Sequence, residues 1–170
     1  ELDAINESGS TAMMVAATCG HAAVIAALAD AGADLYCSTA HNGSTALHLA
    51  SSCGNHIAVE QLLALDSSRR LLDALTAHGA TALHLAAHAA SEPVIRALLE
   101  AKADVHAKDR HRCTPLHYAM RTADEKCVAL LLSAGAATKA AGATSASKAA
   151  PASRSVPGSR EGSAATDRTR

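Results

Sequence analysis

Hydrophobic residues along this chain gather in four short stretches, each with the three- and four-residue spacing that is typical of one face of an α-helix. The stretches recur at nearly equal intervals, and turn-forming and polar residues lie between them. Their large apolar positions are Val24, Ile25 and Leu28; Val59, Leu62 and Leu63; Val94, Ile95, Leu98 and Leu99; and Val128, Leu131 and Leu132. Each stretch predicts an amphipathic helix that buries one apolar stripe.

A second pattern precedes each of these helices. Residues 45–50, 81–87 and 114–119 read TALHLA, TALHLAA and TPLHYA, and residues 11–17 read TAMMVAA, a weaker copy. The four threonines recur every 33 to 36 residues. A threonine hydroxyl can accept a hydrogen bond from a free N–H in the first turn of a helix, so each copy predicts a short helix. Self-similarity at this period indicates a repeat architecture built from helix pairs.

Glycine marks the expected helix ends, and the exceptions to it predict strain. Gly20 and Gly54 follow the first helix in two copies, where a residue of positive φ commonly ends a helix. Ala90 and Ala123 hold this place in the other two copies, so slightly strained or altered turns are expected there.

The second helices are expected to end in the same way. Gly32 and Gly135 fit the position that follows such a helix, whereas Lys102 replaces glycine in the third copy. A left-handed lysine should cost on the order of 1 kcal/mol relative to glycine. Arg112 likewise stands where the other copies have a turn glycine two residues before the threonine.

Taken together, the sequences of these copies resemble the ankyrin repeat. The resemblance rests on the TPLH-type starts, a first helix ended by Gly-His or Gly-Asn, a V-x-x-L-L-type second helix and a GAD-V-x-A-type exit. It implies an all-α solenoid of stacked helix-turn-helix units with short hairpin-like turns. The expected repeats cover about 1–35, 36–70, 71–106 and 107–139, and residues 1–6 align with the end of a preceding repeat, which suggests that the natural protein continues upstream.

The repeat pattern of the sequence ends at Lys139. Residues 140–170 are mostly Ala, Ser, Gly, Thr and Arg, with almost no large apolar residue. Such a segment cannot bury enough apolar surface to offset the entropy of ordering it, so a disordered tail is expected.

Composition narrows the possible functions. The 170-residue chain has no Phe or Trp and only two Tyr, which predicts a thin, alanine-rich core. Its formal charge of −1 gives no overall bias toward polyanions. Nucleic-acid binding by the basic C-terminal end is an alternative, but the near-neutral balance and the absence of stacking aromatics argue against it.

The cysteine pattern and the hydropathy of the chain indicate where in the cell the protein is expected. The five cysteines contain no C-x-x-C pair, which favours reduced thiols in an intracellular protein, cytoplasmic or nuclear. No run approaches the roughly 20 apolar residues that a membrane span requires, so no membrane partner is expected.

The ten histidines suggest metal or catalytic chemistry, but a structural role explains the repeated ones better. The pairs Cys53–His56 and Cys113–His117 have local ligand spacing without a second pair to complete a zinc site. We therefore expect no metal, no cofactor and no catalytic residue. The resemblance implies a hydrogen-bonded turn network formed by Thr45, His48, Thr81, His84, Thr114 and His117.

The resemblance also implies the function, which is protein–protein binding through the concave face of the array. This face consists of the turn tips before each threonine and the exposed end of each first helix. Its candidate partner-binding residues are His41, Asn42, Ser52, Cys53, His78, His88, Arg110, His111, Arg112 and Arg121.

The arginines of the fourth repeat point to a chemical class of partner. Guanidinium groups suit planar anions, so they predict docking of a protein partner with an acidic or phosphorylated segment, although solvated surface arginines are the alternative. We expect a non-enzymatic, monomeric scaffold with no small-molecule substrate. The other possibility is that the repeats form the targeting or regulatory module of a larger enzyme or membrane protein.

Overall fold

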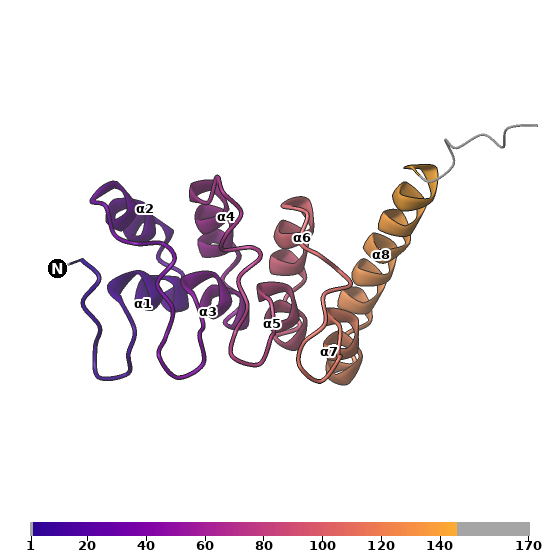
Figure 1. Ribbon diagram of the computed structural model, residues 1–170, viewed down its shortest axis with the longest axis horizontal. Helices are drawn as coiled ribbons and strands as arrows, with labels where there is room; N and C mark the ends of the chain where they lie inside the picture. Colours follow the sequence, from indigo (N-terminus) through magenta and orange to yellow (C-terminus); the bar gives the residue numbers. More distant parts are fainter. Residues whose placement is uncertain (1, 146–170) are drawn as a thin grey trace, which may run out of the picture.

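The computed structural model describes residues 2–145, with side chains described as far as Gly135. Eight helices follow one another in this part of the chain as four pairs (Figure 1). They are α1 (Ala12–Cys19), α2 (Ala22–Asp30), α3 (Ala46–Ser52), α4 (His56–Leu65), α5 (Ala82–His88), α6 (Glu92–Glu100), α7 (Pro115–Thr122) and α8 (Glu125–Ser145). The predicted all-α architecture is confirmed; the one β feature in the described residues is an isolated antiparallel bridge between Ser38 and Thr45.

The pairs stack side by side in two layers. The first helices α1, α3, α5 and α7 pack in series, and the second helices α2, α4, α6 and α8 form the neighbouring layer in the same order. Figure 1 shows the loops between pairs projecting as a row of turns beyond the first helices, on the side away from the outer ends of the second helices. Each pair therefore contacts its neighbours in sequence, as the repeat pattern predicted.

The core between the two layers is thin and continuous. Ile25, Val59 and Ile95 occupy one repeat position on α2, α4 and α6, and each is fully buried. Small residues such as Ala50 and Ala86 are also fully buried on the first helices. Because alanine adds little bulk, neighbouring helices can approach closely, which explains how the array packs without Phe or Trp.

The predicted left-handed residues adopt that conformation. Gly20 ends α1 with φ 77°, and Ala90 and Ala123 hold the matching positions after α5 and α7 with φ 51° and 55°. Lys102 and Arg112 also have positive φ, 64° and 61°. Because a Cβ is disfavoured in this region, the four non-glycine residues are sites of local strain.

The predicted end of the last helix was wrong. Gly135 was expected to terminate it, but α8 continues through Gly135 as far as Ser145. The residues that follow are rich in alanine, the strongest helix former, whereas a glycine inside a helix costs only about 1 kcal/mol. The expected repeat boundary after Lys139 consequently falls inside α8. A disordered tail was predicted from residue 140 onward; this was wrong for residues 140–145, which form the end of α8, and residues 146–170 lie outside the described residues.

Candidate binding surface

Polar side chains shape the turns that project from the array. In the fourth repeat, Asp109 Oδ1 accepts hydrogen bonds from the backbone N–H groups of His111 (2.9 Å) and Cys113 (2.8 Å). In the third repeat, Thr76 Oγ1 accepts one from the Ala80 N–H at 3.1 Å. These bonds satisfy backbone N–H groups that are not hydrogen-bonded within a helix or sheet. They therefore fix the conformation of the turns and the positions of the side chains that the turns carry.

The repeated histidines fasten each turn to the next. His48 Nδ1 accepts from the Thr45 backbone N–H at 3.3 Å, and its Nε2 lies 3.2 Å from the Ala80 carbonyl oxygen of the following turn. His84 repeats the arrangement, with Nε2 at 3.0 Å from the Cys113 carbonyl oxygen. Because Nδ1 accepts and the carbonyl can only accept, the network assigns the proton to Nε2.

Burial keeps these two imidazoles neutral. Both side chains are fully buried, and desolvation lowers the pKa of His48 to about 4, although the carbonyl of Ala80 favours the charged form. Desolvation also lowers the pKa of His84. Neutral rings are required here, because a protonated Nδ1 would confront the threonine N–H with another donor.

His117 has the same local contacts but a different environment. Its Nδ1 accepts from the Thr114 N–H at 3.1 Å, as in the other copies. The side chain is exposed, however, and within the described part of the chain no further turn lies beside its Nε2. The turn network predicted for six residues therefore joins turns only through His48 and His84.

Backbone hydrogen bonds also join successive turn tips. The Ala77 N–H donates to the Asn42 carbonyl at 2.6 Å, and the Arg110 N–H donates to the His78 carbonyl at 3.0 Å. We call the surface formed by the tips at 41–44, 77–80 and 110–113, with the adjoining exposed sides of α3, α5 and α7, the turn face. It is a continuous surface because these bonds hold the tips in one row (Figure 1).

A groove of about 310 Å³ runs along the turn face between the tips and the first helices. Leu49 and Leu85 form its apolar side, with Tyr118 at the same repeat position on α7. Among the predicted partner-binding residues, Asn42, Ser52, His78 and His111 line it. We call this feature the turn groove; it brings together residues from three successive repeats.

Tyr118 is a groove residue that the sequence analysis did not select. Its hydroxyl donates to Asp109 Oδ2 at 2.7 Å, and its ring lies edge-on to His84 and His88, with centroid distances of 5.4 and 6.1 Å. The hydrogen bond to Asp109 raises the pKa of Tyr118. The signal was present in the sequence, because an aromatic residue replaces the leucine found at positions 49 and 85.

Asp109 is the carboxylate at the centre of this contact. Burial alone would raise its pKa, but hydrogen bonds from the Tyr118 hydroxyl and from the Cys113 and His111 N–H groups outweigh that effect, and the pKa is lowered. Asp109 is therefore ionised, and both of its carboxylate oxygens accept hydrogen bonds from its own repeat. The carboxylate is buried against the turn rather than exposed to solvent.

The remaining predicted residues lie outside the groove lining, and all of them are exposed. His41, Arg110 and Arg112 lie in the turns, whereas Cys53, His88 and Arg121 lie at or next to the C-terminal ends of α3, α5 and α7. Within the described residues, the one ion pair is that of Arg96 and Glu92 on α6, 2.6 Å apart. The arginines of the last repeat therefore form no ion pair with a described residue. The positive charge of Arg121 acts on Tyr118 in the groove, where it favours the ionised form of the Tyr118 hydroxyl.

Residues 2–145 contain no cluster of three or more potential metal ligands. In the same range, no helix is both long and apolar enough to cross a membrane. Of the polar side chains at the turn groove, Asn42 and Thr76 accept hydrogen bonds from backbone N–H groups of their own turns, and His78 and His111 are exposed. A stack of helix pairs with a row of linked turns is the architecture of a repeat-type binding scaffold.

The comparisons with known proteins identify the class of scaffold. The family model described as ankyrin repeats, in three copies, matches residues 1–71 and 56–141. The chain therefore belongs to the ankyrin repeat family, as its repeated text indicated. Ankyrin repeats are generally non-catalytic modules that bind other proteins. Comparison with curated proteins gives no match for this chain.

Proposed function

We propose that this chain binds a partner protein through the turn face, with a segment of the partner lying in the turn groove. The groove combines an apolar side, formed by Leu49 and Leu85, with a polar rim that includes His78 and His111. Binding sites in proteins commonly pair apolar contact area with a few placed polar groups. Because solenoids bind along extended surfaces, a groove that crosses three repeats suits an extended peptide segment.

The bound segment is acidic or phosphorylated. One observation carries this part of the proposal: Arg110 and Arg112 in the last turn and Arg121 near the end of α7 are exposed and have no carboxylate partner among the described residues. Asp109, the carboxylate in that turn, is engaged by Tyr118 and two backbone N–H groups. Guanidinium groups without an internal partner can form bidentate hydrogen bonds with a carboxylate or phosphate.

The protein acts by binding rather than by catalysis. The same surface would serve an array that stands alone and one that targets a larger enzyme or membrane protein. We place the binding inside the cell, cytoplasmic or nuclear, because all five cysteines are free thiols, as expected in a reducing compartment.

Selection of displayed random peptides on the purified chain tests this function. Enriched peptides should carry clustered Asp or Glu, and synthetic versions should bind more weakly as salt rises. Replacing Arg110, Arg112 and Arg121 together by Ala should weaken binding at least tenfold, about 1.4 kcal/mol, because several charge-assisted hydrogen bonds are lost.

A matched control removes the same charge elsewhere. Arg69, Arg70 and Arg96 lie after α4 and on α6, where they contact the Lys102 carbonyl, the Tyr36 ring and Glu92, respectively. Their triple Ala variant should retain affinity. Equal weakening in both triple variants, or unchanged binding of the first variant at low salt, would contradict the proposed site.

A further inference from the structure

The turn groove carries two histidines at one repeat position. His78 and His111 each stand three residues before the threonine of their repeat, and both line the groove. Asn42 holds the same position in the preceding tip. The tips of the two histidines are adjacent, because the Arg110 N–H donates to the His78 carbonyl at 3.0 Å. The two imidazoles therefore belong to neighbouring tips that a backbone hydrogen bond joins.

Neither of these imidazoles has the structural role of the buried histidines. Both side chains are exposed, and among the described residues neither ring takes part in a hydrogen bond. His48 and His84, in contrast, are buried and use both ring nitrogens to fasten successive turns. His78 and His111 can therefore gain or lose a proton without loosening the array.

The groove offers a charged imidazole no internal counter-ion. Among the described residues, its lining includes no carboxylate, lysine or arginine, and its one ionisable group besides the two imidazoles is the Tyr118 hydroxyl. The hydrogen bond to Asp109 raises the pKa of Tyr118, so this hydroxyl stays neutral. Asp109 directs Oδ2 at that hydroxyl and Oδ1 at two backbone N–H groups. The carboxylate of that turn is therefore already occupied.

The other charges around the groove are positive. Arg110 and Arg112 flank His111 in one tip, and Arg121 lies in the last turn of α7. Besides the buried His48 and His84, the other titratable side chains on the three tips and on or next to the three first helices are those of His41, Cys53, His88, Cys113 and His117. Charged imidazoles in the groove would thus meet only like charges until an anionic segment lies beside them.

We propose, as a consequence that rests on the proposed function, that the turn groove binds a carboxylate-rich segment more tightly as the pH falls below neutrality, with His78 and His111 taking up protons on binding. Imidazole is the side chain that commonly gains charge between pH 8 and pH 5, whereas Asp and Glu side chains stay ionised down to about pH 5. Each new contact between an imidazolium and a carboxylate favours the bound state. Binding and protonation therefore promote each other.

Calorimetric titration of the full chain tests the proposal. The probe is a synthetic peptide from the display selection that carries Asp and Glu and has no histidine, cysteine or phosphate, because a phosphate group itself takes up a proton near pH 6. Its affinity should be about fivefold higher at pH 6 than at pH 7.5, as two weak, exposed charge pairs would give. Titrations in buffers of different ionisation enthalpy should show an uptake of about one proton per bound peptide.

A double variant, His78→Gln with His111→Gln, removes both groove imidazoles. It should match the affinity of the native chain at pH 7.5 within about twofold, but show neither the gain at pH 6 nor the proton uptake. Because both side chains are exposed, the substitutions should leave the fold intact. Acid destabilisation through the buried His48 would lower the measured affinity, so it cannot produce the predicted gain.

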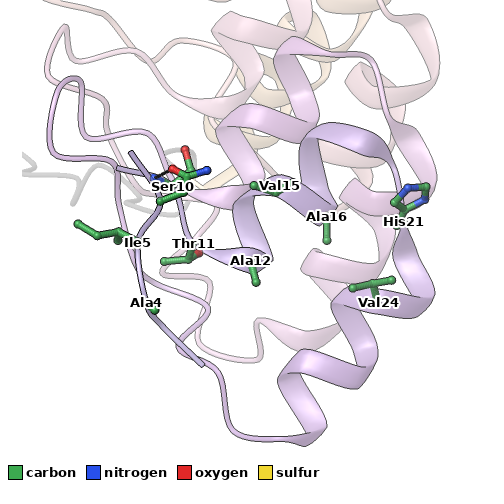
Figure 2. A pocket seen from close by; sticks show the side chains of 10 residues that line it. Ala4, Ile5, Ser10, Thr11, Ala12, Val15, Ala16, His21 and Val24 are labelled. Atoms are coloured by element: carbon green, nitrogen blue, oxygen red, sulfur yellow. Dashed lines mark hydrogen bonds between the residues drawn. The ribbon is translucent and has the colours of Figure 1, made fainter. Parts of the chain in front are cut away.

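The matched control, His21→Gln with His56→Gln, removes the same number of exposed imidazoles elsewhere. Figure 2 shows His21 at a separate hollow beside α1 and α2, which Val15 and Val24 also line. His56 lies with Glu60 in another hollow between α4 and α6. This variant should respond to pH as the native chain does.

The possible outcomes separate the two proposals. Loss of the pH response in the control variant, or its retention in the groove variant, overturns the role of His78 and His111. Equal affinity of the native chain at both pH values without proton uptake also overturns it, while binding that still requires Arg110, Arg112 and Arg121 leaves the proposed function intact. If no acidic peptide binds the native chain at either pH, the proposed function fails and its regulation fails with it.

Discussion

Acidification should weaken the array through His48. The folded-state pKa of this imidazole is about 4, against 6.5 for the unfolded chain, because the ring is fully buried. A lowered pKa means that protons bind preferentially to the unfolded chain. The stabilisation by neutral His48 is therefore fully present above pH 6.5 and is lost as the pH falls toward 4.

The magnitude follows from the difference between the two pKa values. A separation of about 2.5 units corresponds to a loss of about 3 kcal/mol once the site is fully protonated. Between pH 7 and pH 5 the linkage relation gives a loss of about 2 kcal/mol from this one residue. A loss of that size is a large part of the stability of a small domain.

His48→Gln isolates this contribution from other titrating groups. The Gln carbonyl oxygen can accept from the Thr45 N–H and its amide can donate to the Ala80 carbonyl, so the fastening between turns is retained without a titrating group. Urea unfolding at pH 7 and pH 5 should show that the variant loses about 2 kcal/mol less than the native chain over this interval. Equal losses in the two proteins would refute the assignment of a neutral, buried His48.

Four further substitutions test individual contacts and backbone strain by urea or thermal unfolding. Ser51→Ala should raise the free energy of unfolding by about 1–2 kcal/mol, because the buried Ser51 hydroxyl has no hydrogen-bond partner among the described residues and an unmade buried hydrogen bond is costly; a lower stability would contradict this. Ala90→Gly and Lys102→Gly should each stabilise the chain by about 1 kcal/mol, since both residues have positive φ, and unchanged stability would argue against strain there. Tyr118→Phe should cost about 1–2 kcal/mol by removing the hydrogen bond to the carboxylate of Asp109, and a neutral result would show that the contact contributes nothing.

Local rules explain why most of the fold was predictable. The threonine starts, the apolar stripes and the left-handed residues depend on short stretches of sequence, and the repeat then places each pair on the last one. The end of α8 could not be predicted from the repeat pattern. The pattern predicts that the helix ends at Gly135, whereas the alanines after Gly135 favour a longer helix. There, local propensity prevailed over the analogy with earlier copies.

The binding surface was less accessible to sequence reasoning because it depends on neighbours. His48, His84 and His117 occupy the same position of the Thr-x-Leu-His motif, yet within the described residues only the first two reach a following turn. Tyr118 and Asp109 are nine residues apart, and no repeat rule predicts that their side chains meet at 2.7 Å. Predicting these contacts would have required two further observations: the positions at which one repeat differs from the others, and the repeats that have a neighbouring repeat on both sides.

The change from Leu49 and Leu85 to Tyr118 gives the turn groove a direction, and this leads to a last prediction. The groove carries leucine side chains on α3 and α5, whereas at α7 it carries a hydroxyl with arginines nearby. A bound segment should therefore place its apolar residues over the second and third repeats and its acidic residues at the fourth. A selected peptide with a photoreactive group at its acidic end should crosslink to residues 110–121, and one labelled at its apolar end should crosslink to α3. Crosslinks in the reverse order would show that the arginines do not orient the segment.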